Sequence, residues 1–431
     1  MKASSEKRSI IVFTFAVFSV LLCSVLFVLW QTRRVQTQDG VLPVSSVDAK
    51  IMSQTEALAR PGKKQVKEYT TLAALYFQKI RETADPSYYS KVDELLDQAS
   101  ALDATDSSVP ALRAVLENGR HHFKEGYALI TQAIAANPNI VSYYGIRADT
   151  EIELGKYAEA ETSLQKMADS RPDFSSYTRI AYLRELYGDT EGAKEVLTLA
   201  ISAGSPYKEN IAWAYVELGK LQFKSDISLA EASFNRAREI EEEYPLALEG
   251  LARVAFARGN KEQAIKDAEA AFKKIPLAQY ATLLGELYES KGNTTSMAQS
   301  YTLAKIAYER SASSGVDTDL EYALFLSLHG DKTLALSKAK EAYAKRPSVY
   351  GADVLAWAYY KNEQFKEAQA YSKEALRLGD NDPLLVFHAG MIALANNDAA
   401  SAKTYFTEAN ELNPHFSIIY SDVLQSKLKN P

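Results

Sequence analysis

One spacing recurs through most of the chain. A small residue inside an amphipathic stretch returns every 33 to 38 residues, most often after 33 or 34. It falls at Ala160, Ala193, Ala230, Ala264, Met297, Ala335, Ala368 and Ala402, with Gly126 and Val92 one and two periods earlier. A persistent period of about 20 to 50 residues predicts an array of stacked supersecondary units. We therefore count ten units.

Each unit contains two amphipathic stretches joined by a short turn. In residues 154–173, Gly155 supplies the turn and Ala160 stands where two helices are expected to cross. Leu164 then faces the shared core, and Pro172 ends the second helix. Apolar or small residues at helical spacing predict helices, and the low number of prolines, 13 in 431 residues, agrees. We expect an all-α fold.

The units resemble tetratricopeptide repeats, a family of helix–turn–helix units. The stretch ATLLGELYESKGN has Leu284, Gly285, Tyr288 and Gly292 at the family's signature positions, and Leu355, Ala356 and Tyr359 repeat part of it. The resemblance covers about residues 66–414. It implies a right-handed superhelical solenoid. The first unit is also similar to the opening repeat of membrane-anchored bacterial tetratricopeptide proteins.

The resemblance implies that the first helices of successive units line a concave groove that binds protein or peptide partners. The family's spacing of groove positions, applied to this chain, predicts the following partner-binding residues: Asp149, Tyr182, Glu185, Arg253, Glu286, Tyr350, Asp353, Trp357 and Tyr360. Two other interpretations stay open: the aromatic residues pack against neighbouring helices, and the carboxylates form a solvated face. A clamp for a C-terminal carboxylate is not expected, because Gly145 and Asp149 occupy the positions that would need Lys and Asn.

We expect a membrane anchor before the array. Residues 9–30 are 22 residues without a charge, which at about 1.5 Å per residue spans a bilayer's hydrocarbon core of about 30 Å. Residues 1–8 form a short N-terminal segment and 31–65 a polar linker with a possible short helix, DAKIMSQTEALAR. Basic residues flank both ends, with a slight excess before the anchor, which favours an extracytoplasmic repeat domain. Residues 415–431 are expected to form a capping helix and tail.

Composition and motifs exclude several kinds of site. A net charge of −6 gives no basic footprint for nucleic acid. The single cysteine, Cys23, has no internal disulfide partner. The chain has no zinc-protease motif, phosphate-binding loop or nucleophile elbow, and its five histidines lack spaced partners. We expect no cofactor, no metal and no catalytic residue.

These observations predict a single-pass membrane scaffold that binds protein or peptide partners, possible roles being membrane or envelope complex assembly. A self-assembling structural protein, in which one copy docks into the groove of another, is the alternative. An enzyme that uses repeats to position a substrate is disfavoured, because residues 31–65 are too few to fold into a catalytic domain.

Overall fold

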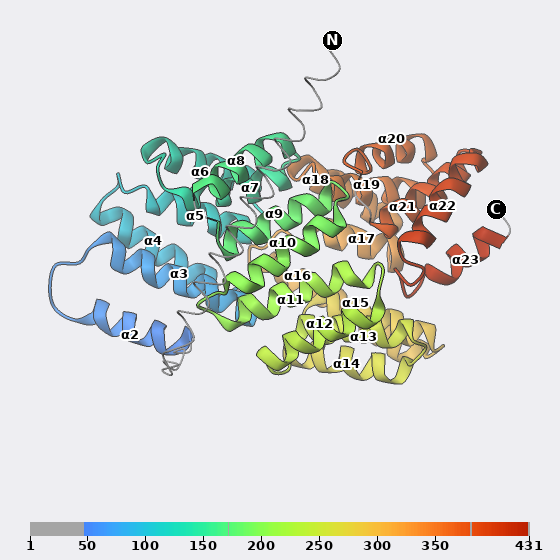
Figure 1. Cartoon of the computed structure of the whole chain (residues 1–431), viewed down its shortest axis with the longest axis horizontal. Helices are drawn as coiled ribbons and strands as arrows, with labels where there is room; N and C mark the ends of the chain where they lie inside the picture. Colours follow the sequence, from blue (N-terminus) through green and yellow to red (C-terminus); the bar gives the residue numbers. More distant parts are fainter. Residues whose placement is uncertain (1–46, 171, 380–381, 430–431) are drawn as a thin grey trace, which may run out of the picture. The chain divides into compact units, whose positions relative to one another are not determined.

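Helices are the only regular elements in the residues that the computed structural model describes, 47–170, 172–379 and 382–429. They confirm the all-α prediction for that part of the chain (Figure 1). Between Val66 and Leu412 the helices form ten consecutive pairs joined by short turns. The strongest contacts of each helix are with its pair partner, and weaker ones join each pair to the next.

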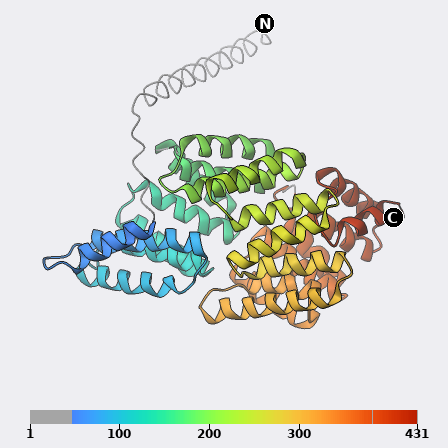
Figure 2. The same cartoon turned by 90° about the horizontal axis from the view of Figure 1, so that it is seen from below.

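The first helices of the pairs are α3 (Val66–Thr83), α5 (Ser108–Gly119), α7 (Val141–Glu153), α9 (Phe174–Leu186), α11 (Lys208–Phe223), α13 (Pro245–Ala257), α15 (Ala278–Ser290), α17 (Asp319–His329), α19 (Val349–Lys361) and α21 (Pro383–Ala395). The second helices are α4 (Tyr88–Leu102), α6 (Phe123–Ala136), α8 (Tyr157–Ser170), α10 (Thr190–Ala203), α12 (Ile227–Ile240), α14 (Lys261–Lys274), α16 (Thr294–Ser313), α18 (Lys332–Lys345), α20 (Phe365–Ala375) and α22 (Ala399–Leu412). Two further helices, α2 (Val47–Ala59) and α23 (Ser421–Lys429), flank the pairs. Figure 2 shows the pairs stacked along the array.

Short polar side chains start many of the second helices. Asp189, Asp226, Asn260, Asn293, Asp331 and Asp398 each accept a hydrogen bond from a backbone N–H in the first turn that follows. Such caps satisfy donors that a helix leaves unpaired at its N-terminus. In the turn before α8, Gly155 has a φ of 69°, a left-handed conformation that glycine adopts without strain. The sequence pattern of turn and cap thus fixes where each pair bends.

Glycine on a first helix lets an aromatic ring of a second helix approach its backbone. A Cβ placed on Gly250 of α13 would lie 2.5 Å from Cε1 of Phe234 on α12. Gly390 of α21 is similarly close to Phe406 of α22, its own pair partner, at 2.6 Å. Phe234 and Phe406 are both almost fully buried. Such close approaches thus occur both between consecutive pairs and within a pair.

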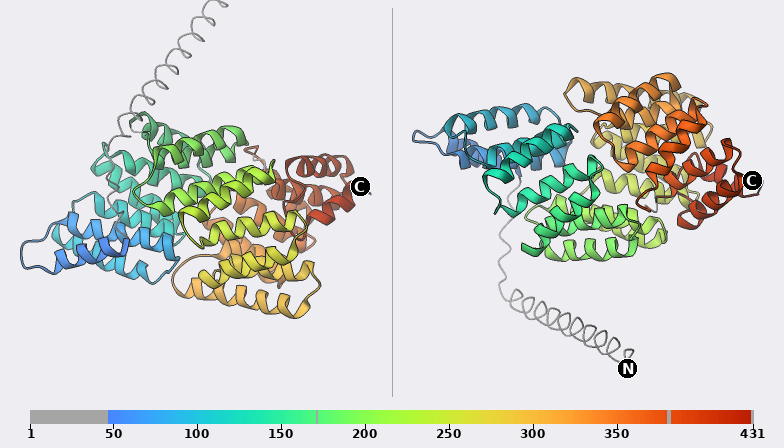
Figure 3. Two further views of the ribbon diagram at one scale, coloured as in Figure 1. Left: turned by 60° about the horizontal axis from the view of Figure 1, so that its bottom comes forward. Right: turned by 90° about the horizontal axis from the view of Figure 1, so that it is seen from above.

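Segments far apart in the sequence also meet. The part of the array from α5 to α8 contacts the part from α16 to α20, and we call this the closing contact (Figure 3). The backbone N–H of Asp317 donates to the carbonyl of Arg120 at 2.9 Å. The side chain of Lys124 donates to the carbonyl of Ala344, also at 2.9 Å. Neighbour-to-neighbour periodicity carries no information about such contacts.

The short helix predicted within the linker is present. It was expected over residues 48–60, DAKIMSQTEALAR, and α2 packs there on α3. Lys79 of α3 makes an ion pair of 2.7 Å with Asp48, and Gln54 donates to the carbonyl of Glu68 at 3.0 Å. Val47 is buried. Tertiary contacts therefore stabilise a helix that is short for an isolated one.

One correction concerns the end of the array. A capping helix was expected from residue 415, but residues 415–420 are not helical and α23 begins at Ser421. The backbone N–H of Ser417 donates to Oγ of Ser421, and Oγ of Ser417 accepts from the N–H of Tyr420, both at 3.2 Å. Local side-chain bonds of this kind compete with helix formation.

The predicted anchor, residues 9–30, lies outside the described residues, as does the N-terminal segment 1–8. None of the helices in the described part of the chain combines the length and the apolar character that crossing a bilayer requires.

Candidate functional site

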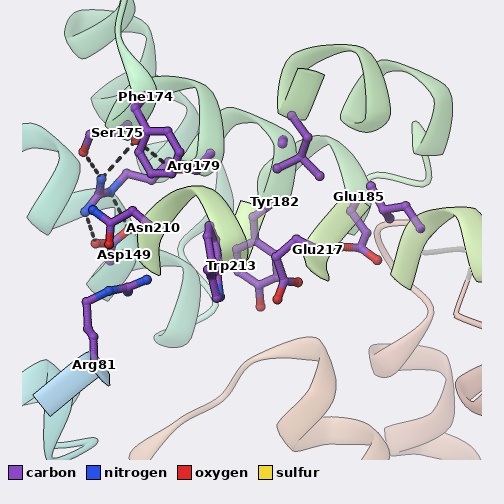
Figure 4. Close-up of a pocket in the computed structure, with 14 residues that line it drawn as sticks. Arg81, Asp149, Phe174, Ser175, Arg179, Tyr182, Glu185, Asn210, Trp213 and Glu217 are labelled. Atoms are coloured by element: carbon purple, nitrogen blue, oxygen red, sulfur yellow. Dashed lines mark hydrogen bonds and ion pairs between the residues drawn. The ribbon is translucent and has the colours of Figure 1, made fainter. Parts of the chain in front are cut away.

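A pocket of about 510 Å³ opens on the first helices α7, α9 and α11 (Figure 4). Arg81 from α3 and Leu197 from α10 complete its wall. The volume falls in the range of about 300 to 1,000 Å³ typical of ligand pockets. The first-helix face of these units therefore has room for side chains of a bound molecule.

Three aromatic side chains, Phe174, Tyr182 and Trp213, line this pocket. All three are half-buried. Burial, with the nearby Glu153 carboxylate, raises the pKa of Tyr182 well above its ordinary value, so its hydroxyl stays protonated at neutral pH. Aromatic side chains contribute much contact area at low entropic cost, and they are the residue types that most often anchor a partner.

Asp149 and Arg179 form a two-pronged ion pair at one side of the pocket, visible in Figure 4. Nε and one terminal nitrogen of Arg179 donate to the two carboxylate oxygens of Asp149, both at 2.8 Å. Arg179 also donates to the carbonyl of Ser175 at 3.0 Å. Paired donors and acceptors fix the orientation of both side chains, so this side of the pocket is preformed.

Asn210 carries an unsatisfied acceptor at the pocket. Its Nδ2 donates to Oγ of Ser205 at 2.9 Å. Its Oδ1 is buried and has no hydrogen-bond partner among the described residues. Buried polar atoms in proteins are nearly always hydrogen-bonded, and an unpaired one costs about 1 to 3 kcal/mol. A bound group with an N–H donor would satisfy it.

The remaining charges of the pocket already have partners. Glu185 pairs with Lys224 at 3.0 Å, and Glu217 pairs with Lys220 at 2.8 Å. Arg81 pairs with the buried Glu209 at 3.2 Å and lies over the ring of Trp213, 5.5 Å from its centroid. The pocket is therefore aromatic with balanced charge rather than acidic.

The residues predicted from the sequence fall into two groups. Asp149, Tyr182 and Glu185 line the pocket together. Arg253 of α13 instead pairs with Glu249 at 3.0 Å. Glu286 of α15 lies 3.7 Å from Nε2 of His329. Arg253 and Glu286 are thus not part of the pocket lining.

The four predicted residues of α19 lie elsewhere. Asp353 and Trp357 are buried, with exposed fractions of 4 % and 1 %, so neither is available to a partner in this arrangement. A carboxylate oxygen of Asp353 lies 3.0 Å from Nδ1 of His388, within hydrogen-bond distance. Trp357 stacks between Tyr360 and His388, with centroid distances of 4.6 and 3.9 Å. The packing interpretation that the sequence left open describes Trp357.

Tyr350 and Tyr360 are half-buried. Tyr350 packs against the same hydrophobic cluster as Tyr182, beside the closing contact. Tyr360 stacks on the ring of Trp357. Neither lines the pocket.

Sequence reasoning missed Trp213, Asn210 and Arg81. The helix α11 has 16 residues, against 13 in α7 and α9, and the extra residues break the period used to find groove positions. Arg81 reaches the pocket from the first unit, through its contact with Glu209. The sequence feature that could have indicated the pocket was Trp213, a tryptophan on a first helix.

Within the described residues, no cluster of three or more histidine, cysteine or carboxylate side chains is arranged to hold a metal ion.

Comparisons with known proteins agree with this architecture. The tetratricopeptide repeat family model matches residues 354–415. No curated protein matches the chain. Among solved structures, the human IFIT1 dimer with m7Gppp-AAAA is 16 % identical, with a TM-score of 0.50, over 77 % of this chain and 76 % of that one.

Two other solved structures are also similar. Yeast Tom70 is 16 % identical over 89 % of this chain and 93 % of its own, with a TM-score of 0.36. PilW, a widely conserved type IV pilus biogenesis factor, is 16 % identical over 47 % of this chain and 94 % of its own, with a TM-score of 0.41. The family match covers residues 354–415, and the similarity to the IFIT1 structure concerns the fold alone. Both agree with an array of tetratricopeptide-type helix pairs.

Proposed function

We propose that the chain is a single-pass membrane-anchored scaffold that binds a segment of a partner protein in the pocket on α7, α9 and α11. The observation that carries this proposal is the buried, unpaired Oδ1 of Asn210 beside the aromatic side chains of the pocket. An extended peptide offers backbone N–H donors along its whole length. A nucleic acid is disfavoured by the net charge of −6.

The partner segment would bring one apolar or aromatic side chain to Phe174, Tyr182 and Trp213, and a backbone or side-chain N–H to Asn210. The Asp149–Arg179 pair would provide a rigid rim. This division is typical of protein recognition, in which a few buried aromatic residues give most of the affinity and polar groups set the orientation.

The anchor in this proposal is residues 9–30, which places the array beside a membrane, on its extracytoplasmic side. The scaffold would then gather partners for assembly at that membrane. No catalytic step is part of the proposal.

Site-specific photo-crosslinking in the native membrane tests the pocket. A photo-reactive amino acid is placed at Phe174 in the full-length chain, and at Leu229, which is 54 % exposed on α12 outside the pocket, as the control. We expect a crosslinked partner protein at position 174 and not at 229. Asn210→Ala should weaken the product at 174, because the acceptor is lost.

Identical products at positions 174 and 229 would contradict the pocket assignment. Crosslinks at 174 to a second copy of the chain would instead support the self-assembling alternative.

A further inference from the structure

The chain covers part of its own first-helix face. Residues 415–420, which we call the terminal segment, leave α22 and cross to helices several units back. Ile418 is 8 % exposed and packs with Leu283, Leu284 and Leu287 of α15. The terminal segment thus does more than cap the last pair.

Aromatic side chains of the terminal segment cover α19 and α21. Tyr420 lies edge-on to Trp357, with ring centroids 5.7 Å apart, and 5.0 Å from the ring of Phe387. Phe416 lies 5.4 Å from Phe387. Three alternate residues, at 416, 418 and 420, therefore make the apolar contacts.

Side chains alone hold the terminal segment on this surface. Among the described residues, the backbone hydrogen bonds of residues 415–420 all stay within residues 413–424. None joins the backbone of the terminal segment to α15, α19 or α21. The segment can therefore leave the surface by giving up side-chain contacts, without breaking a backbone hydrogen bond to it.

The surface beneath has a polar atom that the terminal segment does not satisfy. Nε2 of His388 is buried and has no hydrogen-bond partner within the described residues. Nδ1 of His388 is engaged with Asp353. A buried nitrogen without a partner is rare in proteins, and this one lies on a ring that stacks on Trp357 at 3.9 Å. A different occupant could supply the missing partner.

We propose that the first-helix face of α15, α19 and α21 is a second protein-binding surface, and that the terminal segment occupies it as a built-in competitor. The partner is an extended protein segment with apolar or aromatic side chains at three alternate positions, matching Phe416, Ile418 and Tyr420, and with a polar group that reaches His388. This inference rests on the proposed function, in which first helices bind protein segments, but uses a different surface.

A labelled peptide tests the competition. The probe is NPHFSIIYSDVL, residues 413–424, and its binding to purified full-length protein is followed by fluorescence anisotropy. Ile418→Asp in the protein places a carboxylate in the apolar contact and should release the terminal segment, while Leu424 keeps α23 attached. His415→Asp adds the same charge to the same segment at an exposed position and is the matched control.

We expect Ile418→Asp to bind the peptide about tenfold or more tightly than wild type, because in wild type only the small fraction with a displaced segment can bind. His415→Asp should bind like wild type. The peptide affinity of Ile418→Ala should lie between those of wild type and Ile418→Asp. This milder variant keeps the test informative if circular dichroism shows that Ile418→Asp has lost helix content. A probe that itself carries the Ile418→Asp change should bind none of the proteins.

Equal peptide affinity in wild type, Ile418→Asp and Ile418→Ala overturns the inference, as does absence of binding to all of them. A wild-type dimer that Ile418→Asp converts to monomer also overturns it, because the segment would then belong to a second copy. Trp213→Ala separates the two proposals: it should weaken partner binding at the Asn210 pocket and leave peptide binding by Ile418→Asp unchanged.

Discussion

The hydroxyl of Tyr157, at the start of α8, accepts a hydrogen bond of 2.8 Å from the backbone N–H of Val349, 192 residues further along the chain. Val349 is fully buried and Tyr157 nearly so. Close by, Arg346 pairs with Glu153 and with Glu321, which come from opposite sides of the closing contact. A side chain from the third unit thus satisfies the backbone at the start of the ninth.

Tyr157→Phe should destabilise the protein by about 1 to 3 kcal/mol, because it leaves the buried N–H of Val349 without this acceptor. Urea unfolding followed by circular dichroism measures the change. Tyr187→Phe, at a position 42 % exposed, is the control and should have little effect. Equal losses in the two variants would mean that the hydrogen bond is not the cause.

Gly250→Ala should destabilise by about 1 to 3 kcal/mol through overpacking, since the new Cβ would lie 2.5 Å from the buried ring of Phe234. Helix propensity alone would predict the opposite sign, a gain of about 0.5 to 1 kcal/mol. The direction of the shift in the urea midpoint therefore decides between them. Adding Phe234→Leu should recover part of the loss, because the two changes share one contact.

Glu151→Gln should remove the part of the pH dependence of the unfolding free energy that comes from ionisation of Glu151. Burial raises the pKa of Glu151 above its ordinary value of 4.5, and the hydrogen bond from Ser163 and the charge of Arg147 only partly oppose this. Below 4.5 the carboxyl is protonated in the folded and unfolded states alike. As the pH rises, the unfolded state ionises first, so the stability of wild type relative to Glu151→Gln falls until the folded pKa is passed.

Unfolding free energies of the two proteins, measured between about pH 4 and about pH 7, test this linkage. Glu161→Gln, at an exposed position on α8, should show no such trend. A difference between wild type and Glu151→Gln that does not change over this range would argue against a raised pKa.

The proposed anchor predicts membrane association that survives alkaline carbonate. Full-length protein should stay in the membrane pellet, because residues 9–30 present 22 consecutive uncharged residues to the bilayer. A variant with two arginines at Val17 and Val20 should be extracted into the supernatant, because charges near the bilayer centre are costly. Substituting alanine at the same two positions is the control. Extraction of the wild type would contradict the anchor.

The helix pairs could be predicted because the two helices of a pair are adjacent in the sequence and contact each other. The period set by Ala160, Ala193 and their counterparts marks the crossing of two helices that are adjacent in sequence, and the structure has such pairs from Val66 to Leu412. The glycine turn at Gly155 lies between α7 and α8, where the pattern put it.

The pocket and the buried α19 residues were harder to predict, because both depend on contacts between distant units. Trp357 is buried because Tyr420, from beyond the last pair, covers it. Arg81 reaches Trp213 from the first unit only because Gln78 and Arg81 of α3 both contact Glu209 of α11. A spacing of 33 or 34 residues predicts contacts between neighbouring units. It gives no information about contacts between units that are four or six repeats apart.

The closing contact also bears on how the array comes apart. An open array in which each unit touches only its neighbours can fray, losing its terminal units one after another. Here the second and third units are joined to the eighth and ninth by the bonds of Tyr157, Lys124 and Arg377. Units near the two ends of the array therefore cannot unfold independently of each other, because unfolding either group breaks the closing contact. We expect a single steep unfolding transition, whereas an open solenoid would show a gradual one.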